Sequence, residues 1–263
     1  MKLKMNDCQT HYPLLLLHGL NCRDDRPCFY FGRIPAILTA HGATVYLGGQ
    51  DAWGTIRDNA HFLAKRIQTI LTETQCDKVN IIAHSKGGLE ARYLISSLGM
   101  SSTVASLTTI ATPHYGSRAA AHWLGYTRTL AALGAGLEHF WRHLGDNHPQ
   151  VVPVLQELTP EAMTHFNACN PDAAGIYYQS WGLALGSRCH DPAMALTRRL
   201  LFAYDGETDG LVAPAAARWG HWRGTLEGLS HQDITDCRQK DLSHFHTLTF
   251  YLLLARLLAA LGY

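Results

Sequence analysis

The sequence predicts one α/β domain, built on a mostly parallel open sheet with helices on both faces. The chain has 263 residues and 47% hydrophobic content, which suits one sizeable core. Short apolar runs alternate with helical patterns over the first half of the chain. Strands that are separated by helices pair in parallel, so this order of elements indicates βαβ units.

The expected elements follow one another along the chain. Apolar runs predict strands over residues 13–18, 43–47, 78–84 and 104–111. Helical periodicity predicts helices over residues 33–40, 57–71 and 86–97. Residues 118–150 carry no strand signal and predict a helical insertion, after which strands return at 175–181 and 200–204. The apolar run at 250–262 is too short to span a membrane and contains Arg256, so it predicts a packed terminal helix.

Composition argues against several classes of protein. Lys and Arg number 22 against 21 Asp and Glu, so no basic face is indicated and a nucleic-acid binder is disfavoured. Seven cysteines lie scattered without CxxC pairs, which favours a reducing compartment. The N-terminal stretch is interrupted by polar residues and has no signal-peptidase site. We therefore expect a cytoplasmic protein, or one exported without a cleavable signal, with no transmembrane segment.

The stretch IIAHSKGGLEARYL, residues 81–94, places Ser85 between a buried-type strand and a helix. A serine at a helix start is often only an N-cap. Here the strand's carboxyl end is where open α/β sheets place their chemistry, and Gly87 and Gly88 permit a sharp turn. The frame AHSKG is a nucleophile elbow, G-x-S-x-G with alanine at the first position. Its geometry would direct the amide of Lys86 at an oxyanion, with Leu20, after Gly19, as the second donor.

A serine nucleophile needs a base and an acid, which this kind of fold supplies later in the chain in the order Asp, His. Asp205 and Asp209 follow the expected strand at 200–204, and either could be a mere turn residue. The downstream histidines leave the base open among His221, His231, His244 and His246.

The chain resembles the bacterial true lipases, the family of Pseudomonas, Burkholderia and Proteus-type triacylglycerol lipases. The matching segments run in family order over nearly the whole chain: YPLLLLHGL, FGRIPAILTAHGATVY, KVNIIAHSKGGLEARY, ATPHYGS, LQELTPEAMTHFN, YYQSW, DP at Asp191, TDGLV and SHQDI. The resemblance implies an α/β-hydrolase fold with a helical lid insertion at about 118–150 in a single domain of residues 1–263.

The resemblance also assigns roles to particular residues. It makes Ser85 the nucleophile, Asp209 the acid and His231 the base. Leu20 and Lys86 would supply the oxyanion amides. Arg57 matches an arginine that braces the oxyanion loop in the family, although it could equally be a solvated charge at a helix start.

A structural calcium ion near the catalytic histidine is also implied by the resemblance. Asp191 and Asp233 match the two aspartate ligands, and the carbonyls of Cys237 and Asp241 match the others. Hard carboxylate and carbonyl oxygens suit Ca²⁺, but each aspartate could also be a loop residue or a helix cap. The disulfide and signal peptide of the secreted relatives are not expected here.

The insertion has an apolar stripe at helical spacing, formed by Leu130, Leu133, Leu137, Phe140, Trp141 and Leu144. Such a stripe usually faces a core. Its place in the family pattern favours a lid that covers Ser85 in water and turns toward lipid at an interface.

The leading hypothesis is therefore a serine hydrolase of lipid esters at a lipid–water interface, a triacylglycerol lipase by family default. A phospholipase or a short-chain esterase would use the same triad. A binding protein with an idle triad is the alternative from a different class, because a fold does not fix a function.

Overall fold

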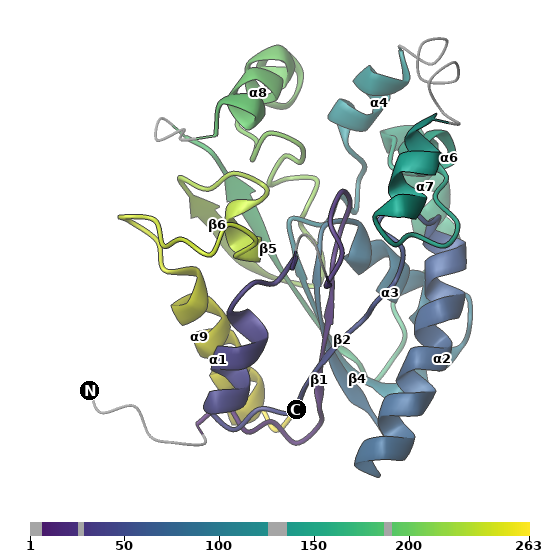
Figure 1. The fold of residues 1–263 in the computed structure, drawn as a ribbon, viewed down its shortest axis with the longest axis vertical. Helices are drawn as coiled ribbons and strands as arrows, with labels where there is room; N and C mark the ends of the chain where they lie inside the picture. Colours follow the sequence, from purple (N-terminus) through teal and green to yellow (C-terminus); the bar gives the residue numbers. More distant parts are fainter. Residues whose placement is uncertain (1–6, 26–28, 126–135, 187–190) are drawn as a thin grey trace.

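The computed structural model describes residues 7–25, 29–125, 136–186 and 191–263. Its centre is a six-stranded sheet in the order β2-β1-β3-β4-β5-β6, in which all neighbouring strands are parallel. The strands are β1 (Leu14–Leu17), β2 (Val45–Leu47), β3 (Val79–His84), β4 (Val104–Ile110), β5 (Tyr177–Ala184) and β6 (His221–Glu227). The predicted α/β fold with a parallel sheet is confirmed (Figure 1).

Helices cover both faces of the sheet (Figure 1). On one face α1 (Ile34–Ala40) packs with α9 (Thr247–Ala260), and on the other α2 (Ile56–Thr74) packs with α3 (Lys86–Ser96). Strand β1 shows why two cores form. Leu14 and Leu16 belong to the α1/α9 core, whereas Leu15 and Leu17 belong to the α2/α3 core, because successive side chains of a strand point to opposite faces.

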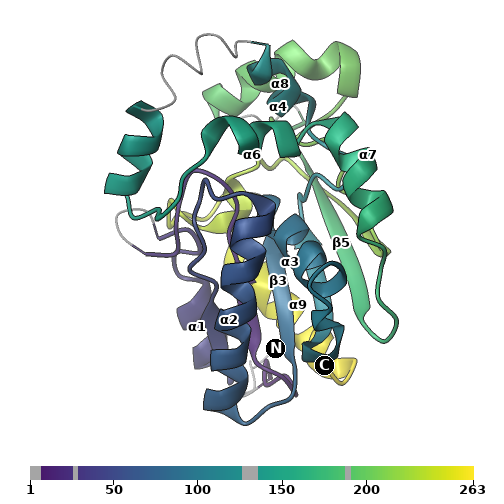
Figure 2. The ribbon, with the colours of Figure 1, turned by 90° about the vertical axis from the view of Figure 1, so that its right-hand side faces the viewer.

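The chain between β4 and β5 is helical, as predicted, where the structure describes it. It includes α4 (Arg118–Leu124), a helix over residues 136–143, α6 (Val151–Glu157) and α7 (Pro160–Cys169). These helices and α8 (Pro192–Asp205) lie at one end of the molecule, above the carboxyl ends of the strands (Figure 2). They therefore surround the end of the sheet at which Ser85 lies.

The strand predicted at 200–204 is wrong, because these residues form the last turns of α8. Leu196 and Leu200 have the i, i+4 spacing of a helix that begins before the apolar run, and a short apolar run cannot by itself distinguish helix from strand. The last strand is instead β6, HWRGTLE, at the sheet edge, where exposed and half-buried residues replace an apolar run.

The cysteines differ from the expectation of a chain with reduced thiols. Cys22 is bonded in a disulfide, while Cys8, Cys76, Cys169 and Cys237 carry free thiols. The other two cysteines, Cys28 and Cys189, lie outside the described residues. A disulfide is typical of oxidising compartments, so cysteine usage does not support the expected reducing environment. In the part of the chain that the structure describes, every helix is too short or too polar to span a bilayer.

Candidate active site

Ser85 occupies the sharp turn between β3 and α3. Its backbone has φ 54° and ψ −130°, a conformation that L-residues rarely adopt and that is typical of strained functional turns. Two glycines permit this turn: a Cβ on Gly87 would lie 2.6 Å from the carbonyl oxygen of His18, and one on Gly88 would lie 2.3 Å from Oγ1 of Thr112. The Ser85 side chain makes no capping hydrogen bond to α3, so its hydroxyl is left for another partner.

That partner is the imidazole of His231. Nε2 of His231 lies 2.8 Å from Oγ of Ser85, and Nδ1 lies 2.6 Å from Oδ2 of Asp209. The Asp209 carboxylate is fully buried, and its Oδ1 accepts hydrogen bonds from the amides of Leu211 and Val212 at 2.9 and 2.8 Å. These donors fix the carboxylate, which in turn orients the imidazole toward Ser85. The structure thus brings the predicted nucleophile, base and acid together.

The competing candidates lie elsewhere. Asp205 ends α8 and pairs with Nε of Arg118 at 2.8 Å. His221 stacks on Tyr177 at the outer strand, and Nε2 of His244 lies 3.0 Å from the carbonyl oxygen of Gly228. His246 precedes α9 without capping it through its side chain. Geometry therefore separates Asp209 and His231 from the alternatives that the residue pattern had left open.

The loop after β1 runs directly against Ser85. A Cβ on Gly19 would lie 2.7 Å from Cβ of Ser85, and the next residue, Leu20, lines a pocket of about 140 Å³ together with Ser85 and His231. The side chain of Lys86 is buried and turned away from this pocket, because its Nζ donates to the carbonyl oxygen of Gly54 at 2.8 Å and to the Glu90 carboxylate. Only the main chain of Lys86 is therefore left at the Ser85 turn.

Tyr30 and His84 form a buried layer behind the Ser85–His231 pair, and sequence reasoning missed both. The Tyr30 hydroxyl accepts the amide hydrogen of Gly19 and lies 2.6 Å from Nδ1 of His84. The ring of His84 lies 4.6 Å from that of His231. Burial, reinforced by the nearby His231, holds the pKa of His84 well below its usual value, so the ring stays neutral. The hydroxyl thus links the loop that carries Leu20 to the strand end that carries Ser85.

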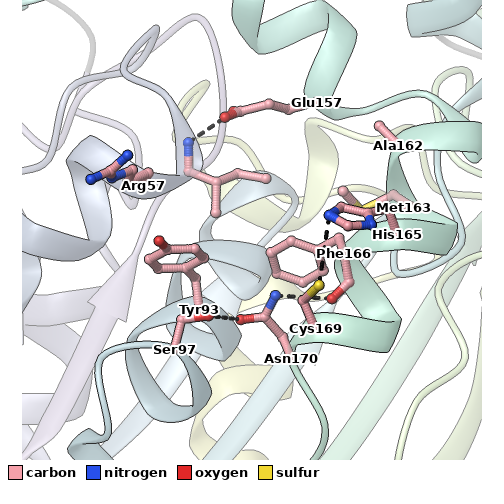
Figure 3. A pocket seen from close by; sticks show the side chains of 11 residues that line it. Arg57, Tyr93, Ser97, Glu157, Ala162, Met163, His165, Phe166, Cys169 and Asn170 are labelled. Atoms are coloured by element: carbon pink, nitrogen blue, oxygen red, sulfur yellow. Dashed lines mark hydrogen bonds between the residues drawn. The ribbon is translucent and has the colours of Figure 1, made fainter.

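Arg57 is not where the resemblance predicted it. It lies exposed in the first turn of α2, and none of the described hydrogen bonds or ion pairs connects it to the loop after β1. It lines a different pocket, between α2, α3 and α7 (Figure 3). Arg23 instead fixes the segment beside that loop, through Asp51 at 3.0 Å and the carbonyl oxygen of Gly49 at 3.3 Å.

The predicted calcium ligands Asp191 and Asp233 do converge, but on an arginine. Nη2 of Arg238 lies 2.7 Å from Oδ2 of Asp191, and Nη1 lies 4.0 Å from Oδ1 of Asp233. Burial opposes ionisation of Asp191, yet the Met194 amide and the Arg238 guanidinium hold its pKa below the usual value. The two carboxylates suit a hard cation by their chemistry, although a guanidinium already contacts both.

The other two predicted ligands, Cys237 and Asp241, were assigned through their carbonyl oxygens. Their side chains have other surroundings: the Asp241 carboxylate binds Arg33 at 2.9 Å, and Cys237 lines the pocket at Ser85 with a free thiol.

Known proteins provide an independent comparison. A family model described as a PGAP1-like alpha/beta domain matches residues 51–159. A triacylglycerol lipase of Vibrio cholerae is 31% identical over 242 residues, which cover 81% of this chain and 75% of that protein. Triacylglycerol lipase 2 of Saccharomyces cerevisiae is 28% identical over 230 residues, covering 84% of this chain and 67% of that protein.

Solved structures support the fold. The crystal structure of Staphylococcus hyicus lipase superposes with a TM-score of 0.76 at 18% identity, covering 99% of this chain and 97% of that one. At this identity the likeness bears on the α/β-hydrolase architecture alone, which it confirms.

Proposed function

Since the chain belongs to the family of bacterial triacylglycerol lipases, and is therefore a carboxylic-ester hydrolase with the α/β-hydrolase fold, we propose that it hydrolyses triacylglycerols with Ser85 as the nucleophile. The observation that carries the proposal is the continuous hydrogen-bonded chain from Ser85 through His231 to Asp209, at 2.8 and 2.6 Å. Chains of this kind activate serine for acyl transfer in unrelated folds.

The reaction proceeds in two acyl-transfer steps. The Ser85 hydroxyl gives its proton to Nε2 of His231 as its oxygen attacks the ester carbonyl, and Asp209 stabilises the resulting imidazolium through Nδ1. His231 then gives the proton to the departing glyceride alcohol, which leaves an acyl ester on Ser85. A water molecule, deprotonated by His231, attacks that ester, releases the fatty acid and restores the hydroxyl of Ser85.

The amides of Leu20 and Lys86 are proposed to bind the oxyanion that forms in both steps. The contact between Gly19 and Ser85 and the position of Lys86 at the start of α3 support this assignment. A single donor of this kind typically contributes about 3 kcal/mol to transition-state stabilisation.

The helical insertion is proposed to act as a lid at a lipid–water interface. Part of its predicted apolar stripe, Leu130 and Leu133, lies outside the described residues. Leu137 and Trp141 pack on a core cluster, as a core-facing helix would, whereas Phe140 is 53% exposed. On α8, which lies at the same end of the molecule, Leu196 and Leu200 are 61% and 54% exposed one helical turn apart. Exposed apolar side chains around a site are typical of surfaces that dock on lipid.

A structural Ca²⁺ would be held by Asp191 and Asp233, with the carbonyl oxygens of Cys237 and Asp241 as further ligands, once the Arg238 guanidinium has left the two carboxylates. It would stabilise the segment after His231 and would take no part in bond breaking. The position of Asp233 two residues after His231 supports a cation site beside the base, and Arg238 is a second cation available to it.

A short-chain esterase is the second candidate, and the volume of the Ser85 pocket favours it. At about 140 Å³ this pocket is smaller than typical ligand pockets, which measure about 300–1,000 Å³. Long acyl chains would need the lid to move.

Hydrolysis rates across acyl length separate the two candidates. With 4-nitrophenyl esters, a triacylglycerol lipase should prefer chains of about eight carbons or more and should be activated by an emulsified interface. A preference for butyrate without interfacial activation would replace the triacylglycerol assignment with a short-chain esterase. Labelling by a fluorophosphonate probe, lost in Ser85→Ala, tests the nucleophile separately from the substrate.

A further inference from the structure

The segment that carries His231 is held by arginines on two sides. On one side Arg33 binds Asp236 through its backbone amide at 2.7 Å and through its guanidinium at 2.7 and 3.0 Å, and it also binds Asp241. On the other side Arg238 binds Asp191 and faces Asp233. The position of the imidazole therefore depends on ionic contacts of residues 233–241.

The carboxylates of Asp191 and Asp233 are buried, each side chain being 4% exposed. Both carboxylates accept backbone hydrogen bonds. Asp191 accepts the amide of Met194 at the start of α8, and Asp233 accepts the amide of Ser230, next to His231, at 2.6 Å. Two buried anions that face one position repel each other and lose hydration, so the pair needs a cation. A guanidinium is suited to this position because it remains charged at any working pH and offers a planar fork of donors.

We propose that Arg238 is the resident cation of the Asp191–Asp233 pair and that Ca²⁺ competes with its guanidinium for the same position. A guanidinium and Ca²⁺ placed between the same two carboxylates would repel each other at close range, and Nη2 of Arg238 already lies 2.7 Å from Oδ2 of Asp191. Calcium can therefore enter only when Arg238 leaves. The side chain is 48% exposed, so it can swing into solvent without disturbing the core.

Arg238 is accordingly a positioning residue. Through Asp191 and Asp233 it connects the start of α8 to the segment that carries His231. It thereby keeps the catalytic imidazole in position without a bound metal. The proposal goes beyond the reaction itself, and its test requires no substrate.

The test compares melting temperatures in EDTA and in millimolar CaCl₂ for the wild type, Arg238→Gln and Arg238→Lys. We expect the wild type to melt at the same temperature in both solutions. Arg238→Gln should melt at least about 3 °C lower in EDTA and recover in CaCl₂, because calcium then replaces the missing charge. Arg238→Lys, which keeps the charge but not the fork of donors, should lose less stability in EDTA than Arg238→Gln. Arg198→Gln, the same change in an exposed ion pair with Glu207, should not respond to calcium.

Calcium titration calorimetry provides a second measurement, with at least tenfold tighter binding expected for Arg238→Gln than for the wild type. The proposal is overturned if the wild type loses stability in EDTA as much as Arg238→Gln does. It is also overturned if Arg238→Gln neither loses stability nor gains calcium binding. Should Arg238→Gln fail to fold in EDTA, its refolding on addition of CaCl₂, with Arg238→Lys folded throughout, supports the proposal, and no refolding overturns it.

Discussion

Two pockets of this molecule each place a nucleophilic side chain beside a histidine, yet only one has the rest of an acyl-transfer site. In the pocket of about 140 Å³, Oγ of Ser85 lies 2.8 Å from Nε2 of His231. In the pocket of about 420 Å³ between α2, α3 and α7, Sγ of Cys169 lies 3.6 Å from Nε2 of His165 (Figure 3). The larger of these two pockets is also the more apolar.

The difference lies in what surrounds each pair. Asp209 orients His231 from a fully buried position, whereas no carboxylate pairs with His165 in the described part of the chain. Ser85 precedes the N-terminus of α3, where amides favour negative charge, whereas Cys169 ends α7, where carbonyl groups disfavour a thiolate. A nucleophile beside an imidazole therefore does not by itself make a reactive site. A carboxylate that orients the imidazole and a helix N-terminus at the nucleophile distinguish the site at Ser85.

The largest expected effect tests this comparison directly. Ser85→Ala should lower kcat for ester hydrolysis by about 10⁵-fold or more, because the acyl-enzyme cannot form. Cys169→Ala, the matched change in the larger pocket, should leave kcat within about twofold. Steady-state kinetics on one 4-nitrophenyl ester measure both, and a large loss in Cys169→Ala would refute the distinction between the pockets.

The carboxylate that orients His231 is tested by comparing Asp209 with Asp205, because the residue pattern could not choose between these two aspartates. Asp209→Asn should lower kcat by about 10⁴-fold, because an amide cannot stabilise the imidazolium and favours the wrong tautomer of His231. Asp205→Asn should have little effect on kcat, since its carboxylate pairs with Arg118 at the end of α8. If the two variants exchanged these outcomes, the acid would be Asp205.

Tyr30 and His84 form a buried layer behind Ser85. Among the described contacts of Cys169, no such pair of buried polar side chains is found. Tyr30→Phe leaves the amide of Gly19 and Nδ1 of His84 without their shared partner, so we expect kcat to fall about tenfold with KM nearly unchanged. Arg57→Gln is expected to change kcat less than about twofold. A Tyr30→Phe enzyme with wild-type kcat would mean that the loop at Leu20 holds its position without the hydroxyl.

Short sequence motifs predicted the parts of the site whose residues lie close together in the sequence. The elbow at Ser85 follows from a buried strand, two glycines and a helix within fourteen residues, 81–94. The contact between Ser85 and His231 joins residues 146 positions apart, so residue pattern left four histidines open and only the family resemblance selected among them. Tyr30 escaped detection because its partner His84 lies 54 positions away and no motif marks the pair.

The errors have physical causes of the same kind. Arg57 matched a family motif in sequence, but a motif does not fix where a long, exposed side chain points. The apolar run at 200–204 is as compatible with the end of an amphipathic helix as with a strand, and the true edge strand β6 has too few apolar residues to be recognised. Regular, buried elements were therefore predictable, whereas edges and exposed charges were not.

The smallest expected effect concerns pH, because the fold buries two neutral histidines, His84 and His114. Burial holds the pKa of His84, behind Ser85, and of His114, beside Arg92, well below the usual value of 6.5. The unfolded chain therefore takes up protons first as the pH falls, so stability is complete above about pH 6.5 and is lost below it, by up to about 1.4 kcal/mol per pH unit for each histidine.

His114→Gln isolates one of these contributions. The variant should be less stable than the wild type at pH 7, because the 3.0 Å contact with Thr109 is altered, yet its stability should fall less steeply between pH 6.5 and 5. Urea unfolding at a series of pH values measures the slope, and His61→Gln, at an exposed position on α2, should leave it unchanged. An unaltered slope in His114→Gln would mean that the fold does not keep this ring neutral, although His114 is as buried as His84.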